Sequence, residues 1–285
     1  MITRLAWKVL IVDDEDDVHE ITRLALKPEK IFDLPIKTLH AKSSKEAMEL
    51  LSTETKALSQ VCVALVDVVM ETDTAGLDLC RYVREDLGDH SMQLIVRTGQ
   101  PGVAPPRKVI DEYDISGYVG KPEVTKEKLY MIVKAGIQQF YNMRIFTDVA
   151  RIDDKCRVGA KDAETAFAMY SKFLGGDFGE GGLNAGWDFG DRYVGTGYFK
   201  DKAVYDEALP GLMERAGPEL RTREFAGVRN PCAWVDDFLI VEAPILRSNK
   251  TARLVVKNPT FPRKLFPLYA SLWRRVISLW AETIA

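Results

Sequence analysis

The first 140 residues alternate short apolar runs with segments in which apolar residues recur at helical spacing. A wholly apolar run such as Val61–Val66 is typical of a parallel strand that is buried on both faces. The predicted strands are Lys8–Val12, Ile36–Leu39, Val61–Val66, Leu94–Val96 and Ile115–Val119. The predicted helices are Val18–Leu26, Ser44–Leu51 with Ser43 or Ser44 as its cap, Gly76–Asp86, Arg107–Glu112, and a long helix capped by Thr125. This order predicts an α/β fold with a doubly wound, five-stranded parallel sheet.

The remaining residues predict a second, mixed α/β domain of unknown type. Helices are expected at 161–173, Lys200–Met213 and Pro267–Ile284, and strands at Glu219–Phe225, Asp237–Glu242 and Arg253–Lys257. The nine glycines between 175 and 197 predict a loop. A chain of 285 residues is near twice the typical ~150 per domain, so we expect domains at 1–141 and 142–285.

The connection between the two predicted domains contains neither glycine nor proline from Ile137 to Val158. The apolar series of Phe140, Met143 and Phe146 continues the preceding helical pattern. We therefore expect a helical joint over 141–150, with an end of the helix near Arg144 as the alternative.

Composition excludes several classes of protein. The net charge of −3 gives no overall field that favours nucleic acid or a membrane surface. No apolar run approaches the ~18 residues of a spanning helix, and the start, MITRLAWKVL, lacks a signal-peptide cleavage pattern. Four scattered cysteines without a C-x-x-C pair indicate a reduced, cytoplasmic protein.

Polar residues that can carry chemistry follow the predicted strands. Asp13 and Asp14 follow the first strand, Asp67 the third, Thr98 the fourth and Lys121 the fifth. Because the carboxyl ends of parallel strands meet at one edge of a sheet, these side chains are expected to lie together.

Three carboxylates at one edge repel one another, by about 4 kcal/mol for a pair ~4 Å apart at an effective dielectric of ~20. A divalent cation that prefers oxygen, Mg²⁺, would compensate this charge together with Lys121. The alternative is that Asp13–Asp17 is a solvated helix start, and this is the interpretation we adopt for Asp16 and Asp17.

The strings VLIVDDE, ALVDVVM, RTG and YVGKP, in that order, resemble the receiver domain of bacterial two-component response regulators over residues 5–141. The resemblance implies that Asp67 is the phosphoacceptor and that Asp13 and Asp14 are carboxylates on the metal side. It also implies that Lys121 pairs with the phosphoryl oxygens and that Thr98 reaches them with its hydroxyl.

Further implications of the resemblance concern the metal, the switch and the partner. The main-chain carbonyl of Val69 would complete the Mg²⁺ ligands, and Tyr118 stands at the position of the switch aromatic. The phosphoryl donor would be a phosphohistidine on a sensor histidine kinase or phosphotransfer protein. A stiff helical joint would allow a phosphorylation-dependent homodimer. The chain departs from the family at Glu71, where a proline is usual, and Gln100 occupies a position that influences how long the acyl phosphate survives.

The second domain contains no histidine, since the last of the three is His90. This excludes a Ser-His or Cys-His nucleophile, histidine-ligated zinc and the histidine-lysine motif of phospholipase D enzymes in that domain. The run WVDDFLIVEAPILR and the strings after it are similar to non-catalytic phospholipase D-like and GAF-type regulatory domains. Separately, METDTAGLDLCRYVRE and RTGQPGVAPP resemble receivers that are joined to cyclic-dinucleotide phosphodiesterases.

We therefore expect a response regulator whose non-catalytic output domain binds a ligand or a protein. An output that processes a phosphodiester is the alternative, and a DNA-binding output is a third, less favoured because no helix-turn-helix or basic stripe is present. A pocket for a small anionic ligand is a further hypothesis, against which we favour a solvated strand face with core tryptophans. The residues of that hypothesis are Arg215, Arg221, Arg223, Arg229, Trp187 and Trp234.

Overall fold

The computed structural model describes residues 6–54, 61–99, 106–159, 165, 184–190, 192–222, 224–225, 228–229, 232–245 and 250–257. The chain divides into two compact units between Thr147 and Asp148. No helix within the described ranges combines the length and the apolar character that crossing a membrane requires.

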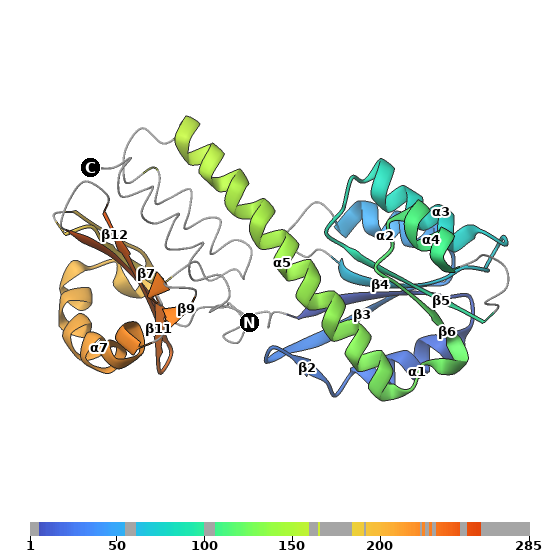
Figure 1. The fold of residues 1–285 in the computed structure, drawn as a ribbon, viewed down its shortest axis with the longest axis horizontal. Coiled ribbons are helices and arrows are strands. Elements are labelled where there is room, and N and C mark those ends of the chain that lie inside the picture. The colour runs from blue at the N-terminus through green and yellow to red at the C-terminus, as the bar shows by residue number, and fades with distance from the viewer. Residues whose placement is uncertain are drawn as a thin grey trace. The chain divides into compact units, whose positions relative to one another are not determined.

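The first unit is built on a six-stranded sheet with the strand order β2-β3-β1-β4-β5-β6, which is parallel except for β2 (Figure 1). The five strands predicted from the sequence are confirmed as β1 (Trp7–Val12), β3 (Leu34–Ala41), β4 (Val61–Asp67), β5 (Gln93–Thr98) and β6 (Gly117–Gly120). A sixth strand, β2 (Lys30–Ile31), was not predicted and pairs antiparallel with β3. Phe32 and Asp33 both have positive φ, 51° and 70°, which matches the tight turn of a two-residue hairpin.

Helices cover both faces of this sheet. Figure 1 shows α2 (Ser44–Glu54), α3 (Ala75–Arg81) and α4 (Pro106–Tyr113) on the face opposite to α1 (Asp16–Leu26). A π-helical turn, η1 (Tyr82–Asp86), extends α3, and a 3₁₀ turn, η2 (Lys121–Glu123), follows β6. The next helix, α5 (Lys126–Gly159), begins in this unit and continues past its boundary at Thr147. The predicted caps are confirmed: Ser43 Oγ accepts the Glu46 N–H at 3.1 Å, and Thr125 Oγ1 accepts the Lys128 N–H at 3.2 Å. The helical joint expected over 141–150 is confirmed, since α5 runs through it.

The central strands are buried on both faces because each face is covered by helices. Every residue of β4 is buried, and alternate residues of β1, β4 and β5 contribute to a core cluster with α2 and α3. The other face packs against α5, where Gly136 is needed for close approach. A Cβ at Gly136 would lie 2.9 Å from Val63 Cγ2, so the missing side chain lets the helix lie against the sheet. This packing fixes the strands whose ends carry the polar residues.

The second unit contains an antiparallel sheet of order β11-β12-β13-β7-β8 and a helix, α7 (Lys202–Thr222). The strands are β7 (Asn184–Asp188), β8 (Tyr193–Gly195), β11 (Cys232–Val235), β12 (Phe238–Pro244) and β13 (Thr251–Lys257). A 3₁₀ turn, η3 (Gly197–Phe199), precedes α7, and β9 (Glu224–Phe225) pairs with β10 (Val228–Arg229). The strands expected at Asp237–Glu242 and Arg253–Lys257 are confirmed as β12 and β13.

Two predictions for this unit are wrong. The predicted strand Glu219–Phe225 is mostly helical, because α7 continues past Pro210 and Pro218 while Leu212, Ala216 and Leu220 stay buried along one side. The predicted loop over 175–197 contains β7 and β8.

The glycines of these two strands make room for aromatic rings. A Cβ at Gly186 would lie 2.4 Å from Tyr205 Cδ2, and one at Gly195 would lie 2.7 Å from the Tyr193 hydroxyl. The expected helices at 161–173 and Pro267–Ile284 and the expected loop at 175–183 lie outside the described residues, apart from residue 165, which is helical.

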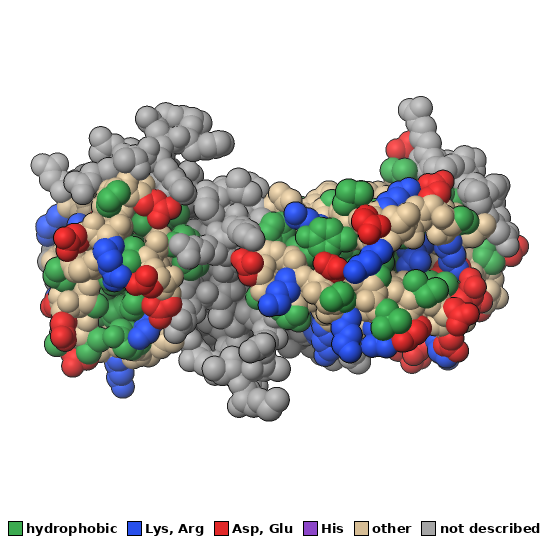
Figure 2. All heavy atoms as spheres, turned by 90° about the horizontal axis from the view of Figure 1, so that it is seen from below, with side chains coloured by type: hydrophobic (Ala, Val, Ile, Leu, Met, Phe, Trp, Pro, Cys, Tyr) green, Lys and Arg blue, Asp and Glu red, His purple; other side chains and the backbone are tan. Residues whose placement is uncertain are grey.

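Both signs of charge occur on the face of each unit that Figure 2 displays, in keeping with the small net charge of the sequence.

Candidate functional site

The parallel strands of the first unit bring the predicted residues to one edge. Asp13 directly follows β1, Asp67 ends β4, Thr98 ends β5 and Lys121 directly follows β6. Strands β1, β4, β5 and β6 are neighbours in the sheet, so residues as far apart as 13 and 121 meet there. The prediction that these side chains lie together is confirmed for Asp13, Asp67 and Lys121 by direct contacts.

Lys121 is the cation at the centre of this edge. Its Nζ lies 2.7 Å from Asp67 Oδ2, 3.0 Å from Asp13 Oδ2 and 2.8 Å from Glu15 Oε1. Burial opposes its charged form, but the hydrogen bonds to Asp67, Glu15 and Asp13 outweigh burial and raise the pKa of Lys121. The side chain therefore stays protonated at neutral pH and offers a fixed positive charge.

Asp67 is a buried carboxylate that is only partly compensated. Burial raises the pKa of its carboxyl, and the charge of Asp13 acts in the same direction, while the hydrogen bond from Lys121 lowers it. The Val68 N–H donates to Asp67 Oδ1 at 2.8 Å. A carboxylate with a raised pKa is more basic, and hence a better oxygen nucleophile, than an exposed aspartate.

Gly76 allows the start of α3 to lie directly against the backbone of Asp67, because it has no side chain. A Cβ at Gly76 would lie 1.8 Å from the Asp67 carbonyl oxygen, so no larger residue fits without a backbone shift. The Gly76 N–H also donates to the Val68 carbonyl at 3.1 Å. The loop after β4 is thereby held directly beside the candidate phosphoacceptor.

Four carboxylates form one cluster at this edge. Asp13, Asp14, Glu15 and Asp67 each offer an oxygen within 4.8 Å of the others, and no other such group of three or more occurs among the described residues. Asp13 and Asp67 are buried while Asp14 and Glu15 are exposed, so the cluster opens to solvent on one side. The four carboxylates carry more negative charge than the single ammonium of Lys121 compensates. Carboxylate oxygens are ligands that suit Mg²⁺.

Two residues of the site were missed in the sequence. Glu15 contacts Lys121, whose hydrogen bond lowers the pKa of the Glu15 carboxyl, and the string DDE already contained this signal. Arg97 is buried next to Thr98 and donates from Nη1 to Thr22 Oγ1 at 3.0 Å, while its Nε has no hydrogen-bond partner in the described part of the chain. A charged residue within the apolar string QLIVRT was the available signal for Arg97.

The other predicted positions that the structure describes lie in β5, in β6 or in the loop after β4. Thr98 is 1% exposed, and Tyr118 in β6 packs against the core cluster under α2 and α3. Val69 lies in irregular backbone two residues after Asp67. Glu71, at the departure from the family, accepts the Ser44 N–H on Oε1 at 2.9 Å and so ties the loop after β4 to the start of α2. Gln100 lies outside the described residues.

The candidate anion-binding residues of the second unit have other partners where they are described. Arg215 Nη1 contacts Asp236 Oδ2 at 2.5 Å on the surface. Trp187 is 1% exposed and stacks on Phe189 with ring centroids 5.2 Å apart. These contacts agree with a solvated face and a core tryptophan. Trp234 is partly buried, and the side chains of Arg221, Arg223 and Arg229 lie outside the described residues.

Comparison with known proteins gives three kinds of match. The family described as "Response regulator receiver domain" matches residues 9–134. The 3'3'-cGAMP-specific phosphodiesterase 2 of Vibrio cholerae is 41% identical over 149 residues, which are 52% of this chain and 27% of that protein. The chain therefore spans about a quarter of the length of this curated relative.

Solved structures of receivers are also similar to the chain. A receiver domain protein of Methanospirillum hungatei shares 19% identity at a TM-score of 0.40, over 49% of this chain and 99% of its own. The signal receiver domain of an HD domain-containing protein from Pseudomonas fluorescens shares 21% identity at a TM-score of 0.42, over 50% of this chain and 95% of its own. The family match carries the assignment: residues 9–134 are a response regulator receiver domain, a component of phosphorelays.

Proposed function

We propose that Asp67 accepts a phosphoryl group, in the presence of Mg²⁺, from a phosphohistidine on a sensor histidine kinase or phosphotransfer protein. The observation that carries this proposal is the contact of buried Asp67 with Lys121 inside a cluster of four carboxylates. The receiver family supports a histidine kinase as the partner.

The groups around Asp67 supply what phosphoryl transfer needs, which is alignment and neutralisation of charge. Val68 N–H and Lys121 hold the two carboxylate oxygens, so the orientation of the nucleophile is set before a donor arrives. The ammonium of Lys121 would turn from carboxylate oxygens to an oxygen of the transferred group. Its raised pKa ensures that it carries a full charge during this step.

Asp13, Asp14 and Asp67, with the carbonyl of Val69, would hold Mg²⁺, and Glu15 adds negative charge to the same edge. The bound ion supplies a positive charge that neutralises oxygens of the transferring group. The excess of carboxylates over cations is the feature of this chain that supports such a site.

The acceptor assignment is tested with acetyl phosphate. Wild type and Asp67→Asn are incubated with acetyl phosphate and excess Mg²⁺, and the intact mass is measured. We expect one phosphoryl group on wild type, none on Asp67→Asn, and none on wild type in EDTA. Asp86→Asn, which neutralises an exposed carboxylate outside the cluster, is the control and should be phosphorylated like wild type. Equal uptake by wild type and Asp67→Asn would refute the assignment.

We further propose that Thr98 and Tyr118 transmit phosphorylation to a homodimer interface, with α5 as the connection. The support is that Thr98 ends the strand beside Asp67, that Tyr118 lies in the next strand, and that α5 runs 34 residues without a break. Thr98→Ala should be phosphorylated to the wild-type extent but fail to dimerise with beryllofluoride in sedimentation experiments. If wild type sediments identically with and without beryllofluoride, the dimer is refuted.

A second candidate function is hydrolysis of a cyclic dinucleotide under control of the receiver. The relative from Vibrio cholerae favours an enzymatic output over the non-catalytic output that we expected from the sequence. The candidate is tested by incubating the chain with 3'3'-cGAMP and Mg²⁺ or Mn²⁺, with and without beryllofluoride, and following the linear product by chromatography. Turnover that beryllofluoride changes would establish this output. Binding without turnover would support the non-catalytic alternative instead.

A further inference from the structure

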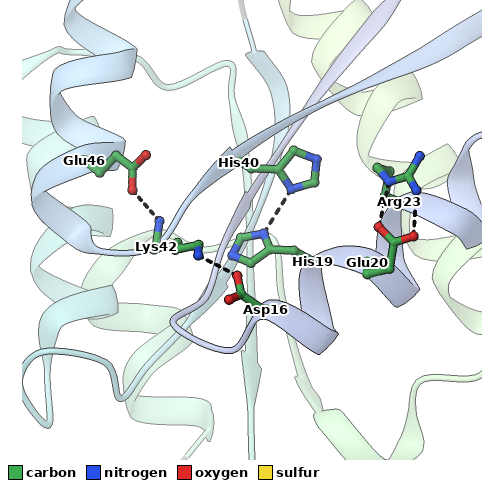
Figure 3. Close-up of a pocket in the computed structure, with 7 residues that line it drawn as sticks. All are labelled: Asp16, His19, Glu20, Arg23, His40, Lys42 and Glu46. Carbon is green, nitrogen blue, oxygen red and sulfur yellow. Dashed lines mark hydrogen bonds and ion pairs between the residues drawn. The ribbon is translucent and has the colours of Figure 1, made fainter.

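A second group of titratable side chains lies beside the receiver site. It lines a pocket of about 460 Å³ formed by α1, the end of β3 and the start of α2. Figure 3 labels its seven lining residues and shows the rings of His19, from α1, and His40, from β3, pointing toward each other and joined by a dashed line. The chain has three histidines, so two of the three meet in this pocket.

The two rings approach through the same nitrogen. His19 Nδ1 and His40 Nδ1 are 3.0 Å apart, and the ring centroids are 5.1 Å apart with an angle of 59° between the planes. His19 is 8% exposed, so the surrounding protein holds its ring in place. His40, in β3, is partly buried.

The protonation of each nitrogen follows from its partners. His19 Nε2 lies 2.7 Å from the main-chain carbonyl oxygen of Asp13, which only accepts, so His19 Nε2 carries the hydrogen. Neutral His19 then has a lone pair on Nδ1, to which His40 Nδ1 donates. Thr38 Oγ1 lies 3.0 Å from His40 Nε2 and donates its hydroxyl hydrogen there. Burial, with a smaller contribution from His19, lowers the pKa of His40 and favours its neutral ring.

We propose that His19 and His40 bind a borderline transition-metal cation, of the class of Zn²⁺, Ni²⁺ or Cu²⁺, through their two Nδ1 atoms. Binding replaces the hydrogen between the rings. The His40 hydrogen moves from Nδ1 to Nε2 and is donated to Thr38 Oγ1, whose hydroxyl turns from donor to acceptor. No proton leaves the protein, and both Nδ1 lone pairs face the cation.

The separation of the two Nδ1 atoms is close to what such a cation requires. Two nitrogens at 2.0–2.1 Å from a tetrahedral Zn²⁺ are about 3.3 Å apart, so the observed 3.0 Å would widen by about 0.3 Å. Because the cation would lie off the line that joins the two atoms, each ring would also have to rotate by roughly 35° to direct its lone pair at the cation. His19 would keep its Nε2–H bond to the Asp13 carbonyl, which is the kind of outer contact that orients ligating histidines.

Asp16 also lines this pocket, but its carboxylate does not group with the two imidazoles in this structure, so it would join the cation only after its side chain turns away from Lys42. Its Oδ1 now pairs with Lys42 Nζ at 2.6 Å, and its carboxylate is 77% exposed, so this surface ion pair is weak enough to open for a divalent cation. Imidazole ligands select this class of metal, whereas the oxygen cluster around Asp67 suits Mg²⁺. The two sites are therefore separable by the choice of cation. They are connected through Asp13, whose carbonyl contacts His19 and whose carboxylate belongs to the cluster.

The test is a titration of the tag-free, full-length chain with Ni²⁺ or Zn²⁺, by calorimetry, in buffer with saturating Mg²⁺ to occupy the oxygen cluster. We expect one site per chain that weakens at least about tenfold in His40→Gln. His40→Gln is the main variant, because His40 contacts none of the clustered carboxylates directly. His90→Gln is the matched control, since His90 is 67% exposed and contacts Asp114 elsewhere on the unit. It should bind like wild type.

A second measurement keeps the proposal testable if a variant folds poorly. In wild-type protein with ¹⁵N-labelled histidine, adding Zn²⁺ in excess Mg²⁺ should shift the Nδ1 resonances of His19 and His40 and leave those of His90 unchanged. The proposal is overturned if no cation binds in excess Mg²⁺, if His40→Gln binds as tightly as His90→Gln, or if the shifts appear on His90 alone.

Discussion

Asp67→Asn is expected to stabilise the metal-free protein while it abolishes phosphorylation. The reason is that burial raises the pKa of Asp67, which means that the folded state disfavours the charged carboxylate. Replacing it by an amide of the same shape removes this unfavourable charge. Lys121 keeps Asp13 and Glu15 as partners, so the substitution leaves no isolated buried cation.

The magnitude follows from three opposing contributions. The Asp67 carboxylate lies 2.7 Å from Lys121 Nζ and within 4.8 Å of an Asp13 oxygen. At an effective dielectric of about 20, these contacts correspond to about 6 kcal/mol of attraction and about 3.5 kcal/mol of repulsion. Removing a carboxylate from water costs several kcal/mol, which exceeds the difference of about 2.5 kcal/mol. The raised pKa of Asp67 gives the same sign, and we expect a net gain of about 1 kcal/mol for Asp67→Asn, or about 3 °C in Tm.

The assay is thermal unfolding in EDTA over a range of pH. Because the folded state binds the Asp67 proton more tightly than the unfolded state, wild type gains stability as the pH falls through the raised pKa. The advantage of Asp67→Asn should therefore be largest at neutral pH and vanish once the pH is below the unfolded value of about 3.9. Saturating Mg²⁺ should stabilise wild type more than the variant, since the ion binds only the folded cluster.

A lower Tm for Asp67→Asn than for wild type in EDTA at neutral pH would refute this reasoning, because the contact with Lys121 would then outweigh burial and repulsion. Asp86→Asn is the charge-matched control and should leave the Tm within about 1 °C of wild type, because its carboxylate is exposed and outside the cluster.

Three further substitutions test the packing of the site. Lys121→Gln should lower the free energy of unfolding, measured in urea with EDTA, by about 3 kcal/mol, because it removes the cation shared by three carboxylates. With Mg²⁺ present, the difference in free energy of unfolding between wild type and this variant should be smaller. Gly76→Ala should cost about 3 kcal/mol in the same assay, because its Cβ would meet the Asp67 carbonyl; an unchanged midpoint would contradict that contact. Glu71→Ala should cost about 1 kcal/mol and speed hydrogen exchange at the Ser44 amide, which loses its acceptor. Ser44 exchange at the wild-type rate would exclude this role for Glu71.

The receiver and the residues of its acidic edge could be predicted from local patterns in the sequence. Wholly apolar runs predict parallel strands. The residues at the carboxyl ends of these strands are then expected at the same edge of the sheet, however the helices pack against it. Asp13, Asp67 and Lys121 could be placed together for this reason, although 108 residues separate the first from the last. Local patterns were sufficient to predict these contacts, because in a doubly wound parallel sheet the carboxyl ends of neighbouring strands lie at the same edge.

Contacts between side chains away from those strand ends could not be predicted without the fold. His19 and His40 are 21 residues apart, on a helix and a strand, and no periodicity along the chain relates them. Arg97 likewise reads as a break in an apolar strand until the fold brings it to Thr22.

Two glycines of the second unit lie in strands that could not be predicted from the sequence. Along the chain they predict a loop, since glycine has no side chain to pack in a strand. In the fold, the space beside Gly186 is occupied by the ring of Tyr205, from a helix that begins 16 residues later at Lys202. A glycine favours a strand only when another part of the chain fills the place of its missing side chain, and that information exists only in three dimensions.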